Sequence, residues 1–259
     1  MKKNVTNIWN VLYPIALYYL VSSFAFFAMN IFFGDTTELY MLKQMVSSGV
    51  TIPFLCSLWK QDRYIDDVVY GKEKQNAVQI VFQVVLTCIG MVCIGMAANN
   101  FIAMTPLMEV STGFQTANEN FFGGTMLLEI LASCVVVPIA EELLFRGIVL
   151  KRVTMLTDVR WGVLISAVLF GVIHVNLVQF IYAVLLGLVL ALVVVKTRKV
   201  SLAVWGHAAA NLIAIVRAET GFLDFSYQAK LAGIVFSLVA VVVGVGAIWL
   251  LFKQSGEQS

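Results

Sequence analysis

The chain has 259 residues, of which 60% are hydrophobic and only 12% are charged. A water-soluble domain has about a quarter of its residues charged, so these charges are too few to cover one soluble globule of 28.6 kDa. The mean hydropathy of +0.90 and repeated apolar runs of roughly 20 residues indicate a membrane protein. Both signs of charge are scarce around a net charge of +2, which gives no support to nucleic-acid binding.

Apolar stretches separated by polar breaks predict an all-α, polytopic bundle of about eight transmembrane helices in a single membrane domain, 1–259. The predicted spans are 8–33, 39–59, 77–103, 125–150, 161–176, 179–195, 200–217 and 231–252. The second span contains Lys43, Ser47 and Ser48, which suits a helix that lines a cavity better than one that faces lipid. The role of Lys43 stays open between lining that cavity and reaching the membrane surface.

Lysine and arginine residues fall almost entirely in alternate connections, and this sets the expected orientation. Only Arg217 and Lys230 lie outside if the N-terminus is inside, while Lys43 and Arg146 fall within apolar runs. The other thirteen are then cytoplasmic: Lys2, Lys3, Lys60, Arg63, Lys72, Lys74, Lys151, Arg152, Arg160, Lys196, Arg198, Lys199 and Lys253. Both termini are therefore expected in the cytoplasm. The four cysteines lie in or beside apolar runs and are interpreted as small buried hydrophobic residues.

Ionisable side chains inside spans mark candidate functional sites, because each costs at least about 2.5 to 3.5 kcal/mol at mid-bilayer. The fourth span contains Glu141, Glu142 and Arg146. Glu142 and Arg146 are one helical turn apart and are expected to pair. Glu141 points about 100° away around the helix and is left without a local partner. Glu129, near the outer end of the same span, is interpreted as interfacial.

The chain has two histidines, and both fall within spans: His174 in the fifth and His207 in the seventh. Counted from the inferred cytoplasmic ends, Glu141, His174 and His207 lie about 14, 20 and 10 Å deep. The three can therefore meet near the middle of the bilayer. Asn211 follows His207 by one turn and shares its helical face.

This set of residue types predicts hydrolysis of an acyl bond. A carboxylate in a low-dielectric cavity beside a histidine suits a general base acting on water, and a second histidine with an asparagine amide suits an oxyanion site. Glu141, His174 and His207 are equally candidate ligands for a divalent metal such as zinc with an open water position. No nucleophile motif competes, since Ser166 is eight residues from His174. The alternative, purely structural interpretation is that these residues only hold helices together.

Three motifs stand in order on separate spans: E-E-x-x-x-R at 141–146, F-x-x-x-H at 170–174 and H-x-x-x-N at 207–211. Together they resemble the CAAX protease and bacteriocin-processing (CPBP, Abi) family of intramembrane proteases, which includes type II CAAX prenyl endopeptidases. The resemblance covers about residues 125–217, the expected core helices. It implies an eight-helix bundle whose conical cavity opens to the cytoplasm and to lipid.

The resemblance also implies a role for each motif residue. Glu141 would be the general base assisted by His174, His207 and Asn211 would stabilise the oxyanion, and Glu142, Arg146 and Phe170 would support the site. The family is described as metalloproteases, although the glutamate mechanism needs no metal.

The expected function is an intramembrane endopeptidase that acts on a small hydrophobic or membrane-associated peptide or protein, in a cell membrane and most readily a bacterial cytoplasmic one. The alternative is a non-proteolytic family member, such as a bacteriocin immunity or membrane chaperone-like protein. A proton- or ion-coupled transporter is disfavoured because the sequence shows no internal repeat. The sequence does not predict the natural substrate, the cleavage site or the oligomeric state.

Overall fold

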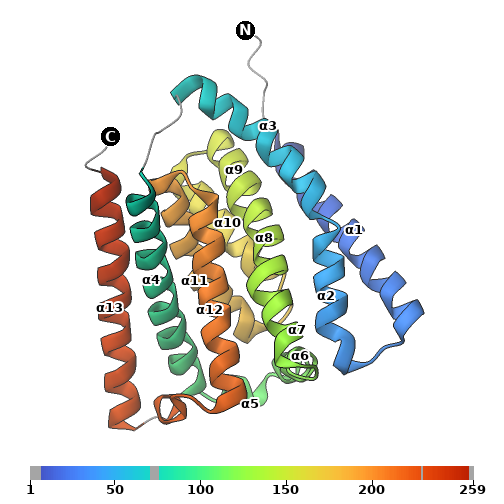
Figure 1. The fold of residues 1–259 in the computed structure, drawn as a ribbon, viewed down its shortest axis with the longest axis vertical. Helices are drawn as coiled ribbons and strands as arrows, with labels where there is room; N and C mark the ends of the chain where they lie inside the picture. Colours follow the sequence, from blue (N-terminus) through green and yellow to red (C-terminus); the bar gives the residue numbers. More distant parts are fainter. Residues whose placement is uncertain (1–6, 71–75, 229, 257–259) are drawn as a thin grey trace.

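The computed structural model describes residues 7–70, 76–228 and 230–256, which form a helical bundle without strands in these ranges (Figure 1). Five described helices are long and apolar enough to cross a membrane: α1 (Ile8–Phe33), α4 (Ala77–Ala103), α11 (Leu177–Thr197), α12 (Val200–Thr220) and α13 (Leu231–Gly256). The predicted all-α polytopic membrane fold is therefore confirmed, and the bounds of α1 and α4 match the predicted spans.

A central helix from Met126 to Leu156 carries both glutamates of the first motif. It consists of α7 (Met126–Ile130), the π-helical segment η2 (Leu131–Val136), α8 (Val137–Glu142), the π-helical segment η3 (Leu143–Val149) and α9 (Leu150–Leu156). With α6 (Thr112–Phe121) it would form a sixth span that is bent by 109°. The connection between the predicted spans 77–103 and 125–150 is therefore partly helical, since it contains both α5 (Leu107–Val110) and α6.

Two predicted spans differ from the structure. The segment 39–59 is not one span, because a break at 50–51 separates α2 (Tyr40–Gly49) from α3 (Ile52–Tyr70). The segment 161–176 overlaps α10 (Val159–Val172), which has 14 residues where about 20 are needed to cross a bilayer. The total of eight spans and the cytoplasmic termini stay predictions. Of the lysines used for the orientation, Lys2, Lys3, Lys72 and Lys74 lie outside the described residues.

Lys43 joins α1 to α2 instead of lining a cavity. Its side chain is completely buried, and its Nζ donates hydrogen bonds to Asn30 Oδ1 at 2.7 Å and to the Gly34 carbonyl at 2.9 Å. The Asp35 carboxylate is 3.6 Å away and exposed. The polarity of α2 therefore serves a helix hairpin, because its buried charge is satisfied by groups at the end of α1.

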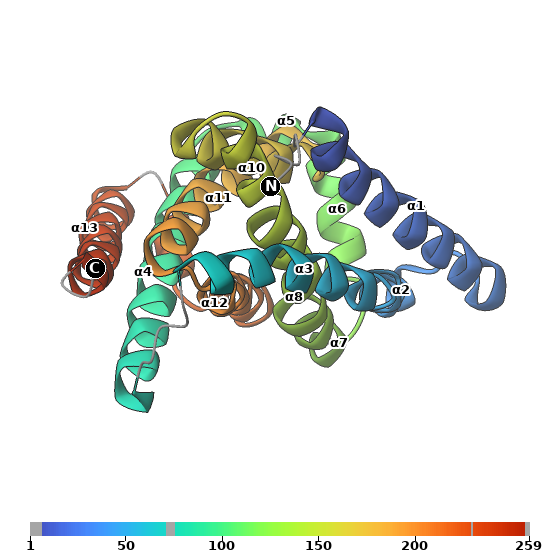
Figure 2. The same cartoon turned by 90° about the horizontal axis from the view of Figure 1, so that it is seen from above.

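The central helix lies between two groups of helices (Figures 1 and 2). On one side it contacts α1, α2 and α3, and on the other α10 and α12. Beyond it, α4 packs against α12 and α13, and α10 packs against α11 as the short break between them predicts. Leu144, Phe145 and Ile148 are consequently fully buried beside the two glutamates, so these carboxylates stand in the protein interior and not against lipid.

A second buried polar cluster lies at the C-terminal end of α12. Arg217 Nη2 donates to Asn100 Oδ1 on α4 and to Ser226 Oγ in η4 (Asp224–Tyr227), both at 2.8 Å. Its guanidinium lies 3.9 Å from the centroid of the Tyr227 ring. Asn100 in turn donates to Ser237 Oγ on α13 at 3.0 Å. The cluster therefore connects three long helices, α4, α12 and α13. Arg217 itself lies within α12, and its side chain is buried.

Candidate active site

The two glutamates stand at the junction between α8 and the π-helical segment η3. A π-helical turn contains more residues than an α-helical one, and such turns are frequent at functional sites. Ser166 on α10 donates a hydrogen bond to the Phe145 carbonyl in η3 at 2.8 Å. This contact fixes the widened turn against α10, and it occupies the hydroxyl of Ser166.

Arg146 is a buried cation with three partners. Its Nη1 is 3.0 Å from Glu142 Oε1, and its Nη2 donates to the Gly187 carbonyl at 3.2 Å. The guanidinium carbon is 4.3 Å from the centroid of the Phe170 ring. A Cβ at position 187 would approach Arg146 Nη2 to 3.0 Å, so glycine lets α11 come close enough for its carbonyl to accept a hydrogen bond from Arg146. The expected pairing of Glu142 with Arg146 is confirmed.

His207 connects the two glutamates. Its Nδ1 lies 2.9 Å from Glu142 Oε1, and its Nε2 lies 3.9 Å from Glu141 Oε2. All three side chains are buried. Because an ionised carboxylate only accepts hydrogen bonds, Nδ1 carries the hydrogen shared with Glu142. Glu142 thus accepts from both Arg146 and His207.

The position of His207 depends on the glycine before it. A Cβ at Gly206 would come within 2.8 Å of Met91 Cγ and 2.9 Å of Thr87 Cγ2 on α4. Contacts this short do not occur, so the Met91 and Thr87 side chains or one of the two helices would have to shift. The missing side chain therefore lets α12 and α4 pack at the depth that places His207 against the glutamates.

His174 lies just beyond α10, where its Nδ1 is 3.0 Å from the Phe170 carbonyl. The Phe170 ring packs edge to face with both histidines, at centroid distances of 5.2 Å to His174 and 5.6 Å to His207. Val175, the next residue, has a φ of 60°, a conformation that strains a β-branched residue. Asn176 closes the turn by accepting from Gln179 N at 2.9 Å and donating to the His174 carbonyl at 3.1 Å.

A cavity of about 50 Å³ adjoins these groups. Both histidines and Asn211 line it, together with Met91, Phe170, Tyr182, Ala183, Leu186 and Leu190. Asn211 Nδ2 donates one hydrogen bond, at 2.7 Å, to the Ser133 carbonyl in η2. A polar cavity of this size has room for water. Glu141 does not line the cavity, but it lies next to His207, which does.

Comparison with known proteins points to the same segment. Residues 123–213 match the family model described as "Type II CAAX prenyl endopeptidase Rce1-like". The match covers about a third of the chain and shows what this segment is similar to. A curated relative from Bacillus subtilis (strain 168), named "Putative membrane peptidase YdiL", is 28% identical over 89 residues, which are 34% of this chain and 36% of that protein. The match thus spans about a third of the relative's length. No solved structure gives a significant match.

The Rce1-like segment contains all seven residues of the predicted site: Glu141, Glu142, Arg146, Phe170, His174, His207 and Asn211. The structure brings them together from the central helix, α10 and its following turn, and α12. Glu141, Glu142 and His207 are in direct proximity, whereas His174 meets them through the Phe170 ring and the shared cavity. Their catalytic roles stay predictions.

The candidate metal ligands do not form a ligand set. Within the described ranges, no group of three or more His, Cys, Asp or Glu side chains is arranged to hold a metal ion. His207 Nδ1 faces Glu142 and His174 Nδ1 faces the Phe170 carbonyl, so only the Nε2 atoms of the two histidines could face a metal. A zinc site at Glu141, His174 and His207 stays a prediction, and no chemical step below depends on a metal.

Glu129 has surroundings that the sequence interpretation did not predict. Its side chain is completely buried where α7 packs on α12 and α2, while its position at the membrane interface stays a prediction. Neither carboxylate oxygen has a hydrogen-bond partner among the residues that the structure describes.

Sequence reasoning did not predict the contributions of Ser133, Ser166 and Gly187, whose contacts with the site are made through backbone carbonyls or depend on a missing side chain. The spacing of Ser166, four residues before Phe170, was the one available signal, since it puts both on one helical face.

Proposed function

We propose that this chain is an intramembrane endopeptidase in which Glu141 activates a water molecule to attack a peptide bond. The observation that carries the proposal is the position of His207 between Glu141 and Glu142 beside a water-sized polar cavity. Buried ionisable groups are costly in a membrane. A cluster of four, on helices that are distant in sequence, is more than packing of the bundle requires.

The charges of the cluster balance in two protonation states. Glu142 and Arg146 form one neutral ion pair. Glu141 and His207 form a second pair, as carboxylate and imidazolium or as carboxylic acid and neutral imidazole. Both states have the same net charge, so a proton can move within the second pair without leaving an unbalanced buried charge. Glu141 would take a proton from water and return it to the leaving amine.

His174 and Asn211 would complete the reaction site. His174 donates its Nδ1 hydrogen to the Phe170 carbonyl, which leaves Nε2 as an acceptor for the attacking water. Asn211 uses one amide hydrogen on Ser133 and has a second to offer to the oxyanion. In its imidazolium form, His207 would offer Nε2–H to the same oxyanion.

The proposed substrate is a small hydrophobic or membrane-associated peptide or protein, because the site lies between membrane-spanning helices. The proposed location is a cell membrane, with the bacterial cytoplasmic membrane as the first one to test. A matched family model and a relative named as a membrane peptidase support this assignment over about a third of the chain.

Mass spectrometry of membrane peptides tests the proposal in cells that express wild type, Glu141→Gln or Glu129→Gln. Glu129 is the matched control, since it is a second buried glutamate on the same helix. Products that appear with wild type and Glu129→Gln but vanish with Glu141→Gln support an endopeptidase. Equal products from all three proteins would contradict it. No product from any protein, with lower thermal stability of Glu141→Gln, would favour the non-proteolytic alternative.

A further inference from the structure

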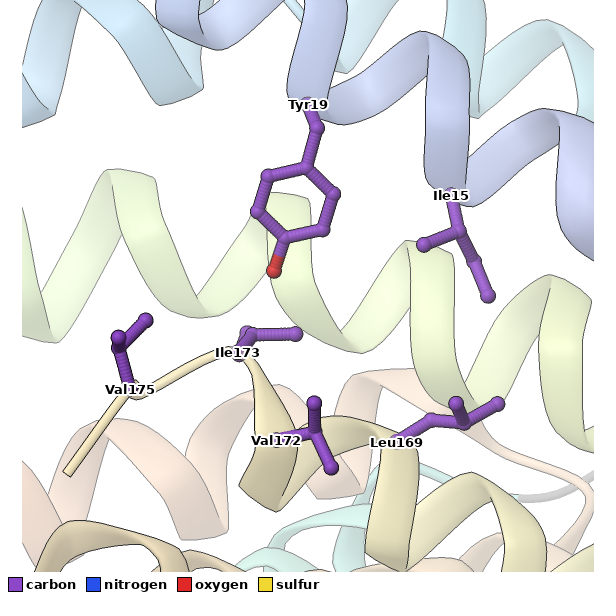
Figure 3. Close-up of a pocket in the computed structure, with 6 residues that line it drawn as sticks. All are labelled: Ile15, Tyr19, Leu169, Val172, Ile173 and Val175. Carbon is purple, nitrogen blue, oxygen red and sulfur yellow. The ribbon is translucent and has the colours of Figure 1, made fainter.

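A second hollow lies on the other side of α10. It has a volume of about 230 Å³ and separates α1 from the end of α10 (Figure 3). Its lining is Ile15, Tyr19, Leu169, Val172, Ile173 and Val175. Val172 and Val175 are 56% and 92% exposed, so the pocket opens at the surface of the bundle. All of its side chains are apolar except for the phenol of Tyr19.

The Tyr19 hydroxyl points from α1 into this pocket, toward Ile173 and Val175 (Figure 3). Its oxygen is buried and has no hydrogen-bond partner in the described part of the chain. A buried hydroxyl without a partner is unfavourable, and a ligand that brings a hydrogen-bond acceptor would satisfy it. The pocket therefore suits an apolar group that is attached to a polar one.

The pocket adjoins the candidate active site. Leu169 and Ile173 line the pocket, while Phe170 and His174, the residues that follow each of them, line the polar cavity. A molecule in the pocket would thus lie against the same segment of α10 and the turn after it that lines the polar cavity.

We propose that this pocket binds an apolar side chain of the peptide substrate beside the scissile bond, while the Tyr19 hydroxyl donates a hydrogen bond to a backbone carbonyl of that peptide. This rests on the proposed endopeptidase function. An apolar cavity of about 150 Å³ holds benzene, so the larger pocket has room for a leucine or phenylalanine side chain. Tyr19 lies near the middle of the 26-residue helix α1. A lipid acyl chain carries no acceptor at that depth, whereas a peptide carries a carbonyl at every residue.

Cleavage of a peptide series tests the pocket. The probes are fluorogenic copies of the sequence cleaved in the mass-spectrometry experiment, with Ala, Leu or Phe at each position that flanks the scissile bond. Wild type is expected to prefer Leu or Phe at one position. Leu169→Trp, which fills the pocket, is expected to raise KM for those peptides on the order of tenfold and to spare the Ala peptide. Leu164→Trp is the matched control, because Leu164 is exposed on the same helix outside the pocket.

Tyr19→Phe tests the hydrogen bond separately. Loss of one neutral hydrogen bond is expected to raise KM about threefold to tenfold for all peptides without a change in side-chain preference. The melting temperature is expected to stay equal or rise, because the hydroxyl has no hydrogen-bond partner among the described residues. A fall in melting temperature with unchanged KM would show a structural hydroxyl and overturn its proposed role.

The outcomes separate the two proposals. If Glu141→Gln abolishes cleavage but Leu169→Trp keeps the wild-type preference, the pocket proposal is wrong and the endopeptidase proposal stands. If Leu169→Trp lowers all rates equally, the pocket holds a lipid chain or only shapes the fold, and the proposal is again wrong. If Glu141→Gln still cleaves, the catalytic proposal is wrong. The effect of Leu169→Trp on the preference for Leu or Phe peptides then still tests whether the pocket binds a substrate side chain.

Discussion

Among the described residues, two arginines are almost completely buried, and they have different neighbours. Arg146 pairs with a carboxylate that also contacts His207. Arg217 makes no salt bridge with a described residue, and its charge is met by Asn100, Ser226 and the Tyr227 ring. Both are 1% exposed. Burial of a cation alone thus does not distinguish a site from a structural joint.

The difference lies in what the neighbours can exchange. Glu141, Glu142 and His207 carry groups that can accept or release protons, and all three lie close to Arg146 beside a cavity. Amide and hydroxyl oxygens beside Arg217 hold the cation but exchange no proton in the physiological range. We therefore assign chemistry to the Arg146 region and helix joining to the Arg217 region.

His207→Ala is expected to give the largest effect. Loss of an acid–base group lowers the cleavage rate by roughly 10²- to 10⁴-fold. Asn100→Ala, at the centre of the Arg217 region, is expected to keep kcat at the wild-type value while it lowers stability. Cleavage of the fluorogenic peptide by both purified proteins measures this, and equal losses of kcat would remove the distinction between the two regions.

Substitution of each arginine by methionine compares the two clusters by stability. Arg146→Met leaves Glu142 buried without its cation and is expected to cost about 3 to 5 kcal/mol. Arg217→Met leaves neutral groups that can still pair, since Ser226 Oγ already lies 3.4 Å from Asn100 Oδ1, and is expected to cost about 1 to 3 kcal/mol. Unfolding by SDS in mixed micelles measures both, and the reverse order would contradict the assignment.

Gly206→Ala is expected to cost about 1 to 3 kcal/mol, because the added Cβ overlaps Met91 and Thr87. It is also expected to lower the cleavage rate, since a shift of α12 away from these side chains would move His207. Gly246→Ala on α13 is the control, because a Cβ there meets open space; alanine is expected to stabilise that helix by about 0.5 to 1 kcal/mol. If Gly206→Ala kept full activity, the positioning of His207 by this contact would be disproved.

Val175→Gly and Leu223→Gly are expected to have the smallest effects on stability. Both residues have a positive φ, 60° and 64°, so glycine relieves strain and is expected to stabilise each by about 1 kcal/mol. Only Val175→Gly is expected to lower activity, because it loosens the turn that follows His174. Melting temperatures and cleavage rates test the pair, and a loss of activity in Leu223→Gly would link the Arg217 region to catalysis.

Local patterns predicted most of the helices. Apolar length alone located α1 and α4, since a span needs a continuous run of fixed length. It failed at 39–59, where the break at 50–51 ends a helix that carries buried polar groups. It also gave no sign that Glu129 and Arg217 are buried, because burial of a polar residue depends on neighbours that are distant in sequence.

The sequence by itself determined the membrane class, the three motifs and the i to i+4 pairing of Glu142 with Arg146, because hydropathy and helical spacing are local properties. Only the tertiary structure decided that His207 stands between both glutamates and that Phe170 contacts the guanidinium and both histidines. It also decided that the pocket behind His174 contains a Tyr19 hydroxyl to which no described group is hydrogen-bonded. Those contacts join α1, the central helix, α10 and α12. Their distances depend on how closely helices pack at positions such as Gly187 and Gly206, which no local pattern specifies.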